Sequence, residues 1–122
     1  MAKEIRGFAR TYLVAGDMSA NLYKFVKISG STVVAAAAAT DAVVGVLQNK
    51  PTAAGQPATV MIDGLSKCIA SKAITAGSVV YIAADGRVTD TAASNKAVGI
   101  AESAVTAAGQ VISVLLKPLG AL

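Results

Sequence analysis

The five residues Thr-Ala-Ala-Gly-Gln occur at positions 52–56 and again 54 residues later, at 106–110. Other positions match at the same offset without a gap, and Val44-Gly45 corresponds in this way to Val98-Gly99. Chance matching is the alternative, because Ala and Gly are abundant in this chain. The matches share one register, however, and they alternate as the residues of strands do. An internal repeat therefore constrains the fold more than any single motif does.

Two copies of one unit are predicted at 15–68 and 69–122, behind an N-terminal arm at 1–14. Two copies are too few for a solenoid, but they suit a duplicated half-sandwich or half-barrel in which each copy covers the apolar face of the other. The predicted fold class is all-β, a small antiparallel β-sandwich or barrel built from two pseudo-repeats of about 54 residues. We expect a pseudo-twofold axis to relate them.

Short alternating segments support the all-β prediction. The stretch LYKFVKI at 22–28 alternates in the manner of a half-buried strand, and SVVYIA at 78–83 is its copy. Each is followed by a turn signal, and Asp85-Gly86 between apolar runs is typical of a hairpin. The two Thr-Ala-Ala-Gly-Gln segments lie between strand candidates, so they are predicted turns in which Gly55 and Gly109 supply a positive φ. A phosphate-binding loop would need further glycines and a Lys-Ser/Thr pair, which neither segment has.

The composition predicts a thin core. Hydrophobic residues make up 54% of the 122 residues, but aromatic residues only 4%. Alanine and valine each bury little surface, so we expect association to help the monomer. No stretch reaches the roughly 20 apolar residues of a membrane-spanning helix, and the basic N-terminus is followed by no apolar segment of a signal peptide.

The chemistry-bearing residues exclude most site classes. The chain has no His and one Cys, so we predict no catalytic, metal or cofactor site and no enzymatic activity. Cys68 lies in an apolar segment and is interpreted as a small buried residue. The formal charge is +4, but the lysines are scattered and no basic stripe carries stacking aromatics. We therefore expect no nucleic-acid and no membrane partner.

The order of these features resembles the small capsid cement (decoration) proteins of tailed bacteriophages. That family combines a short polar arm with strands of the types Y-x-x-V-K, VGVL-x-N and VGIA-E in a fixed order. The matching segments cover nearly all of the chain after residue 14: Gly16-Asp17, Tyr23 through Lys27, Val44 through Asn49, Gly55 through Gly64, Ile74 through Tyr81, and Val98 through Leu116.

The resemblance implies an all-β homotrimer on the outer surface of the capsid, at threefold and quasi-threefold positions. It would be made in the host cytoplasm and would clamp neighbouring copies of the major capsid protein in the virion. The family has no catalytic residues to carry over. The alternative is a small virion- or tail-associated module that binds a receptor or a glycan, although Tyr12, Tyr23 and Tyr81 are few for such a surface.

The arm at 1–14 alternates basic with large apolar residues, which is the composition of an interface anchor. We expect it to contact a capsid subunit or a neighbouring cement subunit. The alternative is that the arm is the first edge strand of its own subunit. The predicted interface residues are Ile5, Arg6, Phe8, Arg10, Tyr12 and Leu13.

Overall fold

The computed structural model describes residues 8–38, 41–92 and 96–116, and within these ranges the chain is all-β with no helix. The prediction of an all-β fold is thereby confirmed. The strands are β1 (Phe8–Val14), β2 (Phe25–Ser29), β3 (Thr32–Ala35), β4 (Val43–Leu47), β5 (Pro57–Ile69), β6 (Val79–Ile82), β7 (Val88–Thr89), β8 (Ala97–Ala101) and β9 (Val111–Leu116).

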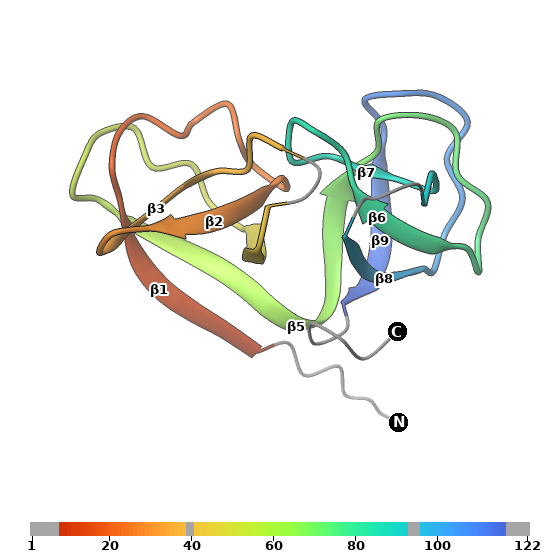
Figure 1. The fold of residues 1–122 in the computed structure, drawn as a ribbon, viewed down its shortest axis with the longest axis horizontal. Helices are drawn as coiled ribbons and strands as arrows, with labels where there is room; N and C mark the ends of the chain where they lie inside the picture. Colours follow the sequence, from red (N-terminus) through yellow and green to blue (C-terminus); the bar gives the residue numbers. More distant parts are fainter. Residues whose placement is uncertain (1–7, 39–40, 93–95, 117–122) are drawn as a thin grey trace.

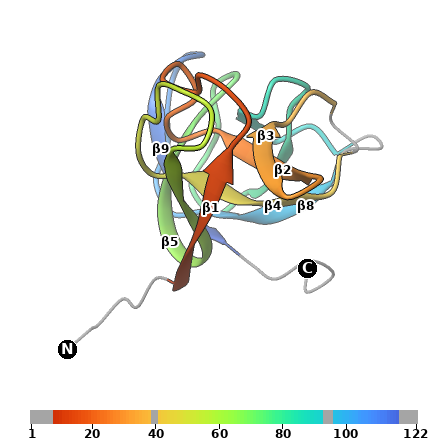
Figure 2. The ribbon, with the colours of Figure 1, turned by 90° about the vertical axis from the view of Figure 1, so that its left-hand side faces the viewer.

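The first five strands form a closed barrel. They pair in the order β1-β3-β2-β4-β5, and β1 also pairs with β5, which closes the ring. Figure 2 looks onto this barrel, with β1 crossing in front of its other strands. Its interior is filled by small aliphatic side chains, including the fully buried Val26, Val33, Leu47 and Val60. Alternation along each strand accounts for this, since every second residue faces inward.

β5 belongs to both parts of the molecule (Figure 1). From Pro57 to Asp63 it pairs with β1, and from Gly64 to Ile69 it pairs with β9. Gly64 has φ 101°, a backbone conformation that a side chain would strain, and the partners change at this residue. We call residues 8–62 the N-terminal half and residues 64–116 the C-terminal half.

The C-terminal half has the strand order β5-β9-β8-β6-β7. Its last strand, β7, returns to the chain just after β5 through a parallel bridge between Ala70 and Val88. Its interior is again aliphatic and includes the fully buried Val80, Ile82 and Ile112.

Equivalent strand pairs of the two halves have the same register at the 54-residue offset. Val26 pairs with Gly45 in β2–β4, and Val80 pairs with Gly99 in β6–β8, with an irregularity directly after each pair. The β4–β5 and β8–β9 pairs agree in the same way. Pairing alone does not define a unit of duplication, so the repeat boundaries 15–68 and 69–122 stay a prediction.

The two Thr-Ala-Ala-Gly-Gln segments are turns, as predicted, and Gly55 and Gly109 have φ values of 85° and 87°. The glutamine of each segment accepts hydrogen bonds from the start of its own turn. The Gln56 Oε1 atom accepts from the Thr52 backbone N–H at 2.6 Å, and the Gln110 Oε1 atom accepts from the Thr106 N–H at 2.8 Å. The pentamer is therefore a self-contained turn in which the Gln side chain replaces a backbone acceptor.

Residues 8–14 of the predicted arm form β1 and close the barrel of their own chain. β1 pairs antiparallel with β5 and parallel with β3. This part of the arm is therefore the first strand of its own subunit, as in the alternative, but it is paired on both sides and is not an edge strand. Ile5 and Arg6 lie outside the described residues.

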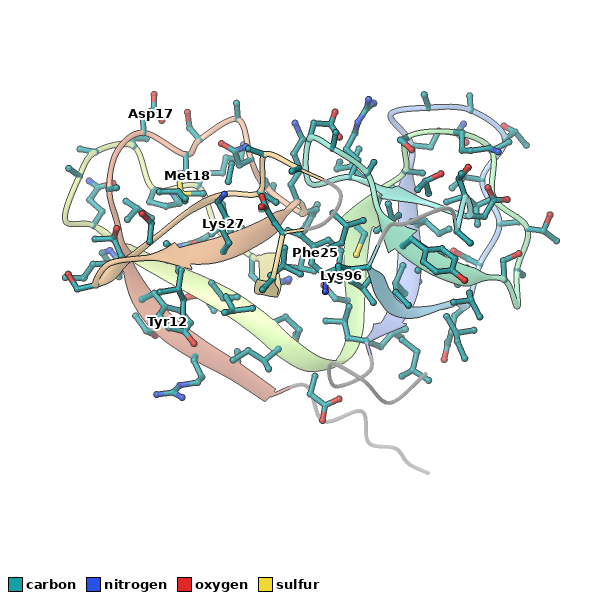
Figure 3. The ribbon with its side chains drawn as sticks, in the orientation of Figure 1. Tyr12, Asp17, Met18, Phe25, Lys27 and Lys96 are labelled. Carbon is teal, nitrogen blue, oxygen red and sulfur yellow. The ribbon has the colours of Figure 1, made fainter. Side chains whose placement is uncertain are left out.

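The two halves meet through surfaces that are not equivalent. The Phe25 N–H donates to the Gly86 carbonyl oxygen at 2.8 Å, and the Ile69 N–H donates to the Tyr23 carbonyl oxygen at 3.1 Å. Phe25 and Val46 of the N-terminal half are buried in the hydrophobic cluster of the C-terminal half. Figure 3 shows Phe25 between the two groups of strands. A twofold axis would repeat each contact with the equivalent residues exchanged, so Val79, the equivalent of Phe25, would be buried against the N-terminal half. Val79 is 38% exposed, so this contact does not have the expected pseudo-twofold arrangement.

Candidate interaction surface

The acidic side chains mainly stabilise loops. The Asp17 carboxylate accepts a hydrogen bond from the Ser19 backbone N–H at 2.9 Å, which lowers the pKa of Asp17. The Asp41 carboxylate accepts from the Ala37 N–H at 2.8 Å and lies 3.1 Å from the Lys27 Nζ, and both contacts lower the pKa of Asp41. Within the described ranges, no three His, Cys, Asp or Glu residues gather where they would hold a metal ion.

Asp85 and Asp90 flank a short strand, but each is paired with a cation of its own chain. Asp85 lies 2.7 Å from the Arg87 Nε atom, and Asp90 lies 3.0 Å from the Lys72 Nζ atom. Cys68 is fully buried, and burial raises the pKa of its thiol from 9.0 to about 12. Its thiolate is thereby suppressed at neutral pH, as expected for a structural cysteine. No helix among residues 8–38, 41–92 and 96–116 is long and apolar enough to cross a membrane.

An open hollow lies beside the loop that follows β1. It is lined by Asp17, Met18 and Asn21 from this loop and by Val34 and Ala35 of β3. In Figure 3 the Asp17 side chain points away from the barrel, whereas Met18 lies beneath the loop. The Met18 side chain packs in the N-terminal core. The hollow thus presents loop backbone and one capping carboxylate, which is a weak basis for a ligand site.

The predicted interface residues divide between the two faces of β1. The Arg10 guanidinium carbon lies 5.9 Å from the centre of the Tyr12 ring, so these two side chains lie together on one face of the strand. Tyr12 is half-buried and packs against the N-terminal core. Leu13 points to the other face and is half-exposed. For Phe8 the structure gives the backbone pairing with Asp63.

Four large apolar side chains are exposed among the described residues, and sequence reasoning had selected one of them. These are Leu13 and Ile28 in the N-terminal half, and Val79 and Val111 in the C-terminal half. The 54-residue offset places Val79 on Phe25, which is buried. Val79 is therefore exposed to solvent at a position whose counterpart is buried.

A family model described as "Phage cement protein" matches residues 16–116. No curated protein matches the chain. Among solved structures, the N base of the head fibre gp8.5 of bacteriophage phi29 is similar, with a TM-score of 0.70 and 17% sequence identity. The similarity covers 92% of this chain and 95% of that one, and at this identity it shows the fold. β1 lies outside the family match, although it closes the barrel in the structure.

Proposed function

The chain belongs to the phage cement protein family and is a structural protein of the phage capsid, and from this premise we propose that it binds the outer capsid surface as a homotrimer and cements neighbouring major capsid subunits. The observation that carries the proposal is the family match over residues 16–116. The outer surface, the trimer and the capsid partner are the parts of the proposal that go beyond the match.

The physical properties of the molecule suit reinforcement of a lattice. Its nine described strands pair in one continuous sheet, which holds the two halves together. Cementing needs several modest contacts that act together. A trimer at a threefold position repeats each contact three times, and the second and third become intramolecular once the first has formed.

Within this proposal the N-terminal residues anchor the protein to the capsid or to a neighbouring subunit. The predicted anchor comprises Ile5, Arg6, Phe8, Arg10, Tyr12 and Leu13. Because the backbone of β1 is held in its own barrel, it presents the Arg10 cation and the Tyr12 ring together on one face of the strand.

Reconstitution on capsids that lack the protein tests the proposal. We expect added protein to appear in a cryo-EM map as density over the threefold and quasi-threefold positions of the outer shell, and to raise the temperature at which the shell opens. Density confined to the tail would contradict the proposal and favour a receptor- or glycan-binding module. Isolated single copies on the shell would contradict the trimer.

A charge-reversal pair tests the anchor. We expect the double variant Arg6→Glu with Arg10→Glu to bind capsids at least tenfold more weakly than the wild type at low salt. The difference in affinity between variant and wild type should shrink as the salt concentration rises, because salt screens charge contacts. Lys50→Glu with Lys96→Glu changes the net charge equally at two exposed lysines outside the anchor. Equal losses for both pairs would show a nonspecific charge effect and would contradict the anchor.

A further inference from the structure

The contact between the two halves has a face and a rim. The insert face is the surface of the N-terminal half that packs on the C-terminal core, at the buried Phe25, Ala36 and Val46 and the partly buried Tyr23, Val43 and Met61. The rim is the part of the C-terminal half that receives it, at Ile69, Ile82 and Gly86. Ile69 and Gly86 make the two backbone hydrogen bonds across the junction, and Ile82 is fully buried in the same cluster as Phe25.

The C-terminal half carries its own copy of the insert face, in which Val79 is exposed and Ile100 and Leu115 are partly buried. At the 54-residue offset this second insert face consists of Gly77, Val79, Asp90, Ala97, Ile100 and Leu115. Val79, Ile100 and Leu115 stand side by side on neighbouring strands, because Val79 pairs with Ile100 and Ile100 with Leu115. Phe25 is 2% exposed, whereas Val79 in the equivalent position is 38% exposed.

The N-terminal half carries a copy of the rim, which is also open. Leu13 pairs with Pro57 as Ile69 pairs with Val111, so Leu13 takes the place of Ile69. Ile28 takes the place of Ile82, since each pairs with a buried valine before a hairpin. Leu13 and Ile28 are 50% and 51% exposed, whereas Ile82 is 0% exposed. The two hairpins differ in length by one residue, and counted back from the paired valines Ser31 lies two residues before Val33 as Gly86 lies two residues before Val88.

We propose that the second insert face of one copy docks onto the open rim of a second copy of this chain, and so repeats between chains the contact that joins the two halves within a chain. The proposal rests on the homotrimer of the proposed function. It accounts for three of the four exposed large apolar side chains, Leu13, Ile28 and Val79, with one contact. The two surfaces are different and lie on different halves, so the contact is heterologous and forms a closed ring if its rotation closes.

Three copies closed in this way place six halves in one ring. Junctions within a chain, where β5 is continuous, alternate with junctions between chains. Such a ring has threefold symmetry and an approximate sixfold arrangement of similar barrels. It leaves no insert face and no rim open, so a closed ring offers no site for a further copy.

A designed disulfide tests the contact. A Cβ atom at Gly86 would lie 3.4 Å from the Lys24 Cβ, close to the spacing of about 3.5–4.5 Å that a disulfide needs. Ser78 is the equivalent of Lys24 at the 54-residue offset, and Ser31 is the equivalent of Gly86 at the hairpin tip. In the variant Ser31→Cys with Ser78→Cys, we expect mild oxidation to give a covalent trimer that reduction returns to single chains. The native Cys68 is buried and does not compete.

The control is Ser31→Cys with Ala107→Cys, which keeps one partner and moves the other to an exposed alanine outside the second insert face. Both variants are oxidised as free protein at high concentration and on capsids. Covalent trimers formed by the first variant alone support the contact. Equal cross-linking by both variants, or no cross-linking in either setting, would overturn it. A ladder that continues past three chains would overturn the closed ring.

Capsid binding is measured separately, so that the two proposals fail separately. Protein that occupies capsids without cross-linking retains the cementing function and overturns the contact. A cross-linked trimer that does not bind capsids retains the contact and overturns the cementing function. As a second variant, Val79→Asp buries a charge in the proposed contact but sits at a partly exposed position. We expect Val79→Asp to lower the association constant of the trimer at least tenfold while its thermal unfolding changes little. The control Thr75→Asp, at an exposed position, should leave the trimer intact.

Discussion

Gly45 and Gly99 occupy places where the backbone of the next strand leaves no room for a side chain. A Cβ atom at Gly45 would overlap the Met61 carbonyl oxygen, and one at Gly99 would overlap the Leu115 carbonyl oxygen. We expect Gly45→Ala and Gly99→Ala each to lower the free energy of unfolding by about 1–3 kcal/mol, because β4 and β8 must shift away from their neighbours. Denaturant titration measures the loss. Gly16→Ala is the control, since a Cβ there meets nothing within 4 Å, and a loss as large at Gly16 would contradict the explanation.

The glutamines of the repeated pentamer are the second set of residues with a defined role. Three groups donate to Gln56 Oε1, namely the backbone N–H groups of Thr52 and Ala53 and the Thr52 hydroxyl. We expect Gln56→Ala to destabilise the fold by about 1 kcal/mol, as for the loss of ordinary hydrogen bonds. Gln56→Glu keeps the acceptor and should cost less. If both substitutions have the same cost in thermal unfolding, the side-chain acceptor is not what holds the turn.

Cys68 gives a pH dependence with a definite sign. Burial raises the pKa of the Cys68 thiol from 9.0 to about 12, so between these pH values the unfolded chain releases a proton that the folded chain keeps. The contribution of Cys68 to stability is complete below pH 9 and falls as pH rises, by at most about 1.4 kcal/mol per pH unit. The two proteins differ at this one side chain, so the wild type should lose stability more steeply above pH 9 than Cys68→Ala does. Parallel profiles would refute the assignment.

At the scale of residues, the sequence predicted the turns, their glycines and the buried cysteine, because these depend on local conformation and polarity. It did not predict the role of Gln56 and Gln110. A side-chain acceptor is identified only when the backbone N–H groups of the turn are known to converge on it. For the same reason the alternation of β1 was visible, but the face that carries Leu13 was not.

β1 lies within the predicted arm at 1–14, for which the sequence left open an interface anchor and the first strand of the subunit. The 54-residue offset finds no counterpart for it, because Leu13 corresponds by pairing to Ile69, two residues beyond that offset. Its partners in β5 lie some 50 residues away, and such distant pairing leaves no local pattern in the sequence. The sequence therefore does not separate residues 1–7 from the strand that follows them.

Two truncations separate these parts. We expect deletion of residues 2–14 to unfold the N-terminal half, because it removes the strand that closes the barrel and exposes the edges of β3 and β5. Deletion of residues 2–7 should keep the circular dichroism spectrum and the unfolding temperature while weakening capsid binding. Unfolding of the shorter truncation would place residues 2–7 in the fold, and full capsid occupancy by it would remove them from the anchor.

At the scale of the whole molecule, Phe25 joins the two halves, because its side chain from the N-terminal half is buried in the core of the C-terminal half. We expect Phe25→Ala to cost about 3–5 kcal/mol, as for other buried aromatic residues, and to increase hydrogen exchange in β6 and β8 as well as in β2. Exchange that rises in the N-terminal half alone would show that the two halves are independent. Val79→Ala changes the equivalent exposed residue and should cost much less in the isolated protein.

The sequence predicted the strand content, but not which surfaces of the strands are covered. Phe25 and Val79 lie in similar local patterns, and only the docking of one half on the other makes the first buried and the second exposed. How one half docks on the other depends on the direction of β5 after Gly64. The backbone conformation of this one residue, with its positive φ, sets that direction.

The continuity of β5 also has a mechanical consequence. One covalent strand of 13 residues runs through both halves, so a pull that separates them acts along its peptide backbone before it acts on the contact around Phe25. Detaching β5 lengthwise would shear its hydrogen bonds to β1 and β9 together instead of opening them one at a time. Within a chain, the continuous strand β5 therefore resists separation of the two halves. In the proposed trimer, no strand crosses the junctions between chains, so we expect those junctions to separate before the junction within a chain.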